Sequence, residues 1–457
     1  MRARLTSAVV ALVLALAGAL LLLRAGDGLI VHDTIVDGVP LTEVSSSEIN
    51  GSGVVVAHGF AGSGRLMMPF ADTLARRGFV VVLFDFARHG RNTSTTGGNE
   101  LDVAVRHLRS LPGIDGTRIS LVGHSMGAGA VTRYAASHPD IAHTVAISLG
   151  AQVDAPPRML LIVGGLEFAQ FQRTATATVA ASGQRRLVTV PGVEHISVLF
   201  APRTHEEILR WLDAPPGPQP RPWLRLLAGA LLLIAFALGM YPLVALLPRP
   251  ASPSAPPSDP PPALPPTSLM LAAPVAAVAA VGFAAALPDL GVGAYVGAYV
   301  AVAGLLTLLW ARLRGHMPRL GKLSLSSLIF IGYAIISIAV PIHFGLTHAL
   351  PTGPRWLLLP AMVAAFALLG LGTIALTGGR LWPTLAVFAG GAVVLTGAAV
   401  LGVAPRFIML IVPLLVLLLG WQAIWTATLT RAGAPVWLIA VAGGILPAWP
   451  TATAMPL

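Results

Sequence analysis

The chain of 457 residues contains no cysteine. This absence excludes disulfide bonds, zinc sites built from thiolates and a cysteine nucleophile. Charged residues are also scarce: they make up 11% of the chain, against roughly 25% in an ordinary soluble protein. Because 55% of the residues are hydrophobic, the composition excludes an ordinary soluble protein and indicates segments embedded in lipid.

The formal net charge of +10 is unevenly distributed. Residues 27–213 hold 15 arginines and 17 acidic residues, whereas the remainder holds 14 basic residues and only two acids, Asp259 and Asp289. The basic excess therefore lies beside apolar runs, where it sets the orientation of a membrane protein. Basic stripes with interleaved aromatic residues are missing, so we expect no binding to nucleic acid.

The N-terminal segment 1–26 is predicted to be a transmembrane signal anchor. An unbroken apolar run at 7–23 follows Arg2 and Arg4, and its length suits an anchor or a cleaved signal peptide. Because no clear small-x-small cleavage site follows the run, we favour the anchor. With either interpretation, the following segment 27–213 is exported.

Residues 226–457 are predicted to form a membrane domain of about eight helices, joined to the preceding domain by a proline-rich linker at 214–225. A Pro/Ser-rich stretch at 248–267 is expected to be a loop. The candidate spans contain no Asp, Glu, Lys or Arg, which argues against an ion-coupled transporter. These spans are 226–247, 268–287, 290–311, 323–346, 356–377, 381–403, 407–429 and 434–450.

The basic residues of the short loops predict the orientation. With the N-terminus inside, nine Lys and Arg residues fall on the inner side and five on the outer side, and four of the nine lie in the loop 312–322. This asymmetry predicts a multi-pass protein of the cell membrane whose segment 27–213 lies on the extracytoplasmic side. The lipid bilayer is thus an expected partner, and the oligomeric state is left open.

Residues 27–213 alternate strand and helix patterns, which predicts an α/β domain with a parallel sheet covered on both faces. Their number is sufficient for one such core. The predicted strands are 54–57, 80–86, 119–122, 144–148, 159–163 and 186–190. The predicted helices are 66–77, 100–111, 204–212 and one that follows residue 127 to about residue 138.

A G-x-S-x-G pattern, Gly123-His124-Ser125-Met126-Gly127, stands between a predicted strand and a predicted helix. Gly123 and Gly127 permit a tight turn that lifts the Ser125 side chain clear of the sheet, and the helix start offers backbone N–H groups to an oxyanion. Ser125 is therefore the candidate nucleophile. The alternative is a Gly/Ser-rich turn that only closes a strand.

An H-G-x-x-G pattern at 58–62 ends the first of these predicted strands. Loops of this type supply one donor of an oxyanion hole. We expect the backbone N–H groups of Phe60 and Met126 to be the two donors, with His58 and Gly59 supporting the loop. A glycine turn with a structural histidine is the alternative.

A serine hydroxyl needs a base with a pKa near neutrality. His195, between the last predicted strand and the closing helix, is the candidate base, because a late histidine suits this order of elements. Glu167 follows a strand that ends in a glycine turn, and it is the candidate acid that orients the imidazole. Asp154, just after the preceding strand, is the alternative acid.

With these motifs in place, residues 50–213 resemble the α/β-hydrolase superfamily, in outline its dienelactone-hydrolase-like and serine-esterase-like members. A segment at 85–90 (Asp-Phe-Ala-Arg-His-Gly) also resembles the family's D-x-x-G-H-G segment, with Arg88 in place of a glycine. The resemblance covers a little over a third of the chain. It implies hydrolysis by acyl transfer through a covalent acyl-enzyme, and it leaves the acyl group unidentified.

Only about ten residues separate the strand that ends near Ser148 from the one that begins near Met159, too few for a helical lid. We therefore expect an open site whose pocket is shaped by the lipid surface or the first outer loops. The predicted protein is a membrane-anchored serine hydrolase of a lipidic or envelope-derived ester, without cofactor or metal. The alternatives are a serine peptidase or acyltransferase with the same triad, and a membrane scaffold or transporter with a hydrolase-like binding module.

Overall fold

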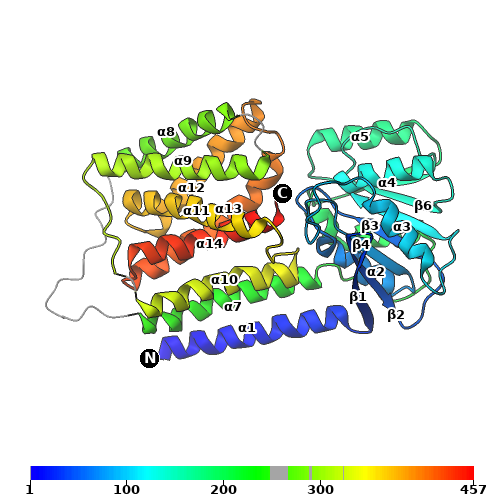
Figure 1. Cartoon of the computed structure of the whole chain (residues 1–457), viewed down its shortest axis with the longest axis horizontal. Helices are drawn as coiled ribbons and strands as arrows, with labels where there is room; N and C mark the ends of the chain where they lie inside the picture. The colour runs from blue at the N-terminus through cyan, green and yellow to red at the C-terminus, as the bar shows by residue number, and fades with distance from the viewer. Residues whose placement is uncertain (1, 248–265, 288–290, 323, 457) are drawn as a thin grey trace. The chain divides into compact units, whose positions relative to one another are not determined.

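The computed structural model describes residues 2–247, 266–287, 291–322 and 324–456 (Figure 1). Its residues divide into two compact units. The α/β unit contains Leu16–Leu231 and Pro341–Gly353, and the helical unit contains the residues up to Ala15, Leu232–Val340 and Pro354–Met455. The expected loop at 248–267 lies outside the described residues except for its last two positions, which begin a helix.

One mixed sheet forms the centre of the α/β unit, with the strand order β1-β2-β4-β3-β5-β6-β7-β8 (Figure 1). The strands β3 to β8 pair in parallel, as expected. An antiparallel hairpin of β1 and β2, which the sequence interpretation did not include, extends the sheet beside β4. The strands are β1 (Leu29–Val36), β2 (Val39–Ser46), β3 (Gly53–Ala57), β4 (Val80–Phe84), β5 (Ile119–His124), β6 (His143–Ile147), β7 (Met159–Gly164) and β8 (Arg185–Val190).

Helices cover both faces of this sheet, because its central strands are apolar on both sides. In β3, Val54 and Val56 join the core under α2 and α6, whereas Val55 joins the core under α3 and α4. Burial of one such side chain stabilises the fold by about 1.5–3 kcal/mol. The helices are α2 (Met68–Ala75), α3 (Glu100–Ser110), α4 (Met126–Ser137), α5 (Ala169–Ala180) and α6 (Pro202–Trp211), with the 3₁₀ turns η1 (Gly64–Met67) and η2 (Ser197–Phe200).

The parallel strands place their carboxyl ends at one edge of the sheet, where ligands of α/β proteins bind. The loops after β3, β4, β5, β7 and β8 all begin at this edge. Among them are the loops that carry Phe60, Ser125, Glu167 and His195, whereas the alternative acid Asp154 follows β6. Residues 148–158, between β6 and β7, contain no helix, in agreement with the expected absence of a helical lid.

Among the described residues, eight helices are long and apolar enough to cross a membrane, and α8 contains a shorter apolar stretch at Ala272–Ala286. Each sequence-predicted span overlaps one of these helices. Within the helical unit α9 and α11 approach closely: a Cβ at Gly304 would lie 2.4 Å from the backbone nitrogen of Leu369. The long helices are α1 (Arg2–Gly26), α7 (Leu224–Leu243, followed by η3, Val244–Leu246), α8 (Pro266–Ala286), α9 (Val292–Leu313), α10 (Leu325–Gly345), α11 (Arg355–Thr377), α12 (Leu381–Val400), α13 (Ile408–Arg431) and α14 (Val436–Ala454).

Candidate active site

Ser125 occupies a strained turn between β5 and α4. Its backbone angles are φ 54° and ψ −111°, a conformation that costs a non-glycine residue free energy. The flanking glycines make the turn sterically feasible. A Cβ at Gly123 would lie 2.3 Å from the carbonyl oxygen of Gly127, and a Cβ at Gly127 would lie 2.4 Å from that of Ala57. The turn therefore requires glycine at both positions.

Three side chains from three different loops form one line of hydrogen bonds. The Oγ of Ser125 lies 3.1 Å from Nε2 of His195, and Nδ1 of His195 lies 3.3 Å from Oε2 of Glu167. His195 and Glu167 are buried, whereas Ser125 is partly exposed. A hydroxyl within hydrogen-bond reach of an imidazole, which is in turn oriented by a carboxylate, is the geometry of an activated nucleophile.

The Glu167 carboxylate is fixed by its other oxygen. Oε1 accepts hydrogen bonds from the Ser148 hydroxyl at 2.5 Å and from the Gly164 N–H at 3.0 Å, which leaves Oε2 directed at His195. Asp154, the alternative acid, is exposed, and its backbone carbonyl accepts a hydrogen bond from Arg185. Among the described hydrogen bonds, the carboxylate that contacts His195 is that of Glu167 and not that of Asp154.

His124 holds the backbone of the candidate base. Its Nε2–H donates to the carbonyl of His195 at 2.9 Å, and the two rings lie 4.8 Å apart. Burial, and then the neighbouring His195, hold the pKa of His124 well below its ordinary value, so this ring stays neutral. A Cβ at Gly59 would lie 2.8 Å from the Nδ1 of His124. The sequence interpretation missed this role, because nothing in the motif marks the residue before the serine.

The loop 58–62 lies beside the serine, since a Cβ at Gly59 would lie 3.2 Å from the Cβ of Ser125. Nδ1–H of His58 donates to the carbonyl of Gly59 at 2.7 Å, and Nε2 accepts the Phe86 N–H at 3.1 Å. Burial lowers the pKa of His58 to about 4, which keeps the ring in this neutral form. These two hydrogen bonds place His58 at the base of the loop, and its supporting role stays a prediction. The ring of Phe60 packs edge-on against His89.

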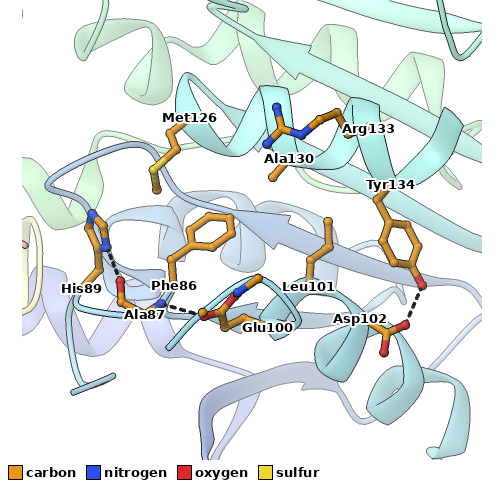
Figure 2. Close-up of a pocket in the computed structure, with 12 residues that line it drawn as sticks. Phe86, Ala87, His89, Glu100, Leu101, Asp102, Met126, Ala130, Arg133 and Tyr134 are labelled. Carbon is orange, nitrogen blue, oxygen red and sulfur yellow. Dashed lines mark hydrogen bonds between the residues drawn. The ribbon is translucent and has the colours of Figure 1, made fainter. Parts of the chain in front are cut away.

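A cavity of about 500 Å³ lies next to the elbow, between α3, α4 and the loop after β4. Figure 2 shows the side chains of Met126 and His89 toward one end and those of Arg133 and Tyr134 toward the other. Much of the lining is apolar, from Phe86, Leu101, Met126 and Ala130. Met126 directly follows Ser125, although neither Ser125 nor His195 is among the residues that line this cavity.

The site thus offers a hydroxyl, an imidazole and a carboxylate in line, with a helix start beside the hydroxyl. The first N–H groups of a helix have no partner within the helix, so the start of α4 can bind a developing negative charge. In the portion of the chain that the structure covers, no group of three or more His, Asp or Glu side chains is placed to hold a metal ion.

The sheet and the elbow define the class. Residues 54–210 match the family described as alpha/beta hydrolase fold, and the predicted fold class is confirmed: an α/β-hydrolase domain followed by a helical region with several apolar helices. One curated relative, from Mycobacterium phage D29, carries the name non-heme haloperoxidase and is 34% identical over 119 residues. This match covers 26% of the chain and 42% of the relative, so the chain spans less than half of that relative's length.

Solved structures that are similar to part of this chain include esterases. The esterase Pf2001 of Pyrococcus furiosus is 19% identical, and the match covers 41% of this chain and 95% of that one with a TM-score of 0.35. A CIB-like hydrolase from Thermoplasma acidophilum is also 19% identical, with 41% and 98% coverage and a TM-score of 0.33. The esterase EstE5 is 18% identical, with 41% and 84% coverage and a TM-score of 0.34.

Proposed function

We propose that this protein is a membrane-anchored serine hydrolase that cleaves an ester-like acyl substrate through a covalent acyl-enzyme. The observation that carries the proposal is the line from Ser125 through His195 to Glu167, with contacts of 3.1 and 3.3 Å. It lies at the carboxyl edge of an alpha/beta hydrolase sheet, where such chemistry is placed in this fold.

The reaction begins when Oγ of Ser125 attacks the carbonyl carbon of the ester while Nε2 of His195 takes the hydroxyl proton. The backbone N–H groups of Phe60 and Met126 hold the oxyanion, and each such donor lowers the activation free energy by about 3–4 kcal/mol. The tetrahedral intermediate breaks its bond to the alcohol oxygen, which receives the proton from His195. Water then attacks the acyl-enzyme by the same route, with Glu167 stabilising the imidazolium in both halves.

The cavity beside Met126 is suited to the acyl chain, because much of its lining is apolar and it begins one residue from the nucleophile. The apolar helices that accompany the domain support a position of this domain near lipid. We therefore propose a lipidic or envelope-derived ester as the natural substrate. The excess of basic residues on alternate loops supports an extracytoplasmic position of the domain in the cell membrane.

The experiment is ester hydrolysis by the full chain in detergent. We expect turnover of p-nitrophenyl esters that depends on acyl length and rises when the ester is micellar, and no turnover by Ser125→Ala. Equal rates for Ser125→Ala and the unsubstituted protein would contradict the serine mechanism. Indifference to both acyl length and micelles would contradict the lipidic substrate and leave the serine mechanism intact.

The same assay separates the alternatives. Aminoacyl-anilides as substrates test for a peptidase, and an added alcohol acceptor tests for an acyltransferase. Because the phage relative is named a non-heme haloperoxidase, hydrogen peroxide is also tested as an acceptor, with halide present. We expect water to be the productive acceptor and esters to be turned over faster than anilides. A folded protein that turns over none of these substrates would favour a binding module.

A further inference from the structure

The α/β unit includes a segment from far along the chain. Residues 341–353, here called the strap, comprise the C-terminal end of α10 and the loop that leads to α11, and they belong to the same compact unit as the sheet. Leu346 packs against the hydrophobic core on the α2 and α6 face of the sheet. Ala349 is fully buried and His348 nearly so. The strap is therefore an integral part of this unit.

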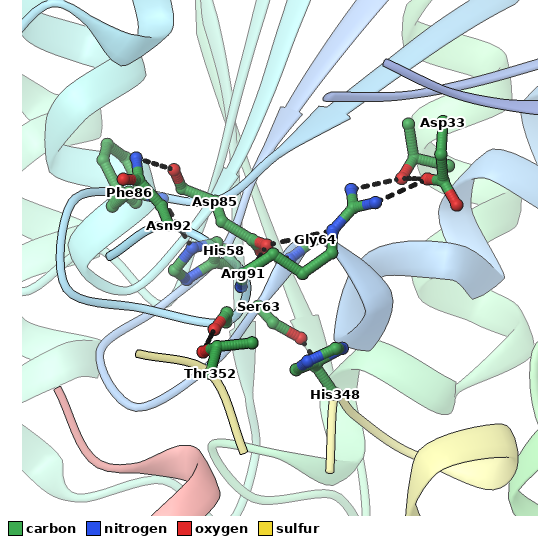
Figure 3. A network of polar contacts seen from close by, with 12 residues as sticks. Asp33, His58, Ser63, Gly64, Asp85, Phe86, Arg91, Asn92, His348 and Thr352 are labelled. Atoms are coloured by element: carbon green, nitrogen blue, oxygen red, sulfur yellow. Dashed lines mark hydrogen bonds and ion pairs between the residues drawn. The ribbon is translucent and has the colours of Figure 1, made fainter. Parts of the chain in front are cut away.

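One end of the strap binds the residues that follow the oxyanion loop. Ser63 is buried, and its Oγ lies 2.9 Å from Oγ1 of Thr347. The same Oγ accepts the His348 N–H at 3.2 Å (Figure 3). Two residues further on, Nε of Arg65 donates to the carbonyl of His343. These contacts fix the chain one residue after the H-G-x-x-G segment.

The other end of the strap binds the loop after β4. Oγ1 of Thr352 donates to the carbonyl of Gly90 at 2.9 Å. Gly353 approaches this loop so closely that a Cβ there would lie 2.7 Å from Cγ2 of Thr93. Gly90 also has no room for a side chain, since a Cβ there would lie 2.6 Å from the carboxylate of Asp85. The strap thus contacts a second loop that reaches the site.

Hydrogen bonds tie these two loops to each other (Figure 3). Asp85 accepts the Gly64 N–H through Oδ1 at 2.6 Å and the Arg91 N–H through Oδ2 at 2.8 Å. The Phe86 N–H donates to His58 at the base of the oxyanion loop. The strap, residues 58–65 and residues 85–92 therefore form one connected network, which includes the loop that carries Phe60.

We propose that the strap positions the oxyanion loop, so that ester hydrolysis depends on the connection between two apolar helices. The proposal rests on the proposed serine hydrolase activity, and it gives the helical region a part in that activity. Thr347 and Thr352 are positioning residues, because they act through Ser63 and Gly90 rather than on the substrate. The sequence-based expectation that the lipid surface or the first outer loops shape the pocket stays a prediction beside this one.

The order of the helices agrees with this arrangement. Four of the described helices, α7 to α10, lie along the chain between the sheet and the strap. If each crosses the bilayer once, an even number of crossings returns the chain to the side on which the sheet lies. The strap can then reach the sheet without a further crossing.

The test compares Thr347→Val/Thr352→Val with the matched control Thr347→Ser/Thr352→Ser, which keeps both hydroxyls. With the full chain in detergent and a soluble short-chain ester, we expect kcat of the valine variant to fall about tenfold with KM within about twofold, because small displacements of catalytic donors are costly. The serine variant should match the unsubstituted protein. Unchanged kcat in the valine variant, or a change confined to KM, would overturn the proposal.

A second experiment tests the contact itself. Because the chain has no cysteine, Ser63→Cys/Thr347→Cys introduces a unique pair. We expect an intramolecular disulfide to form on oxidation, with ester hydrolysis retained, and none in either single variant. Failure of the pair to cross-link would overturn the strap. An efficient cross-link in a protein whose unsubstituted form hydrolyses no ester would instead contradict the proposed function alone.

Discussion

At the scale of single residues, the orientation of the site's side chains depends on which hydrogen bond each of their polar atoms makes. Ser148 and Gly164 hold one oxygen of Glu167, and the other is left for His195. His124 donates a hydrogen bond to the carbonyl of His195, the candidate base. The positions of the candidate serine and its two expected partners could be predicted from sequence, because each follows a recognisable strand. The hydrogen bond from His124 to His195 could not be predicted, since nothing in the motif marks the residue before the serine.

The acid is tested by Glu167→Gln. The amide keeps the volume of the side chain, and it removes the charge that stabilises the imidazolium. We expect kcat to fall by about 10³–10⁴ with KM little changed, as for the acid of a serine-histidine-acid triad. Asp154→Asn is the control and should keep full activity. A large loss in Asp154→Asn, with little in Glu167→Gln, would reverse the assignment.

The elbow is tested by Gly127→Ala. The added methyl would meet the carbonyl of Ala57 at 2.4 Å, and backbone cannot move aside cheaply. We expect a loss of stability of about 3 kcal/mol or more, seen as a lower thermal midpoint. Gly129→Ala, in the same helix, meets only the flexible end of Arg133, and its higher helix propensity should stabilise by up to about 1 kcal/mol. Equal effects of the two substitutions would be evidence against a sterically closed elbow.

At the scale of elements, the central strands and helices were predictable because their periodicity is strong. The hairpin of β1 and β2 was missed, although Asp37-Gly38 is a turn pair and both residues have positive φ. The strand β1 is mostly exposed, and the polar residues 32–34 interrupt its apolar residues, so it lacks the continuous apolar run that marked the other strands. Helix α5 was missed because its small and polar residues give a weak apolar stripe.

The cavity between α3 and α4 gives a prediction about acyl length. Ala130→Trp, on the cavity wall, should fill part of its volume and shift the preferred ester to shorter chains. We expect kcat/KM for an eight-carbon ester to fall at least about tenfold relative to a two-carbon ester, since lost apolar contact costs about 0.8 kcal/mol per buried methylene. Ala136→Trp, at an exposed position of the same helix, should leave the ratio unchanged. An unchanged ratio in Ala130→Trp would place the acyl chain elsewhere.

At the scale of the whole molecule, neutral buried histidines make the fold sensitive to acid. Burial lowers the pKa of both His58 and His205 to about 4. The contacts of His205 suit the neutral ring, because Nε2–H donates to the carbonyl of Leu199 and Nδ1 can accept from the Thr73 hydroxyl. In the unfolded chain these histidines have an ordinary pKa near 6.5. Between about pH 6.5 and pH 4 the unfolded chain therefore binds more protons than the folded chain.

Stability should therefore fall as the pH drops from about 6.5 to about 4, by up to about 3 kcal/mol for each such histidine. His205→Gln removes one of these groups. We expect a lower thermal midpoint for this variant at pH 7.5, but a shallower decline between pH 6.5 and 4, measured on the full chain in detergent. A decline as steep as that of the unsubstituted protein would show that His205 does not titrate in this way.

The most direct measurement is the mass of the protein after exposure to a fluorophosphonate, which reacts with an activated serine. The account predicts one adduct on the peptide that contains Ser125, none on Ser125→Ala, and greatly slowed labelling of His195→Gln. On intact cells a membrane-impermeant reagent should give the same adduct if the domain faces outward. A folded protein that takes up no label, or a Ser125→Ala variant that still does, would contradict the account.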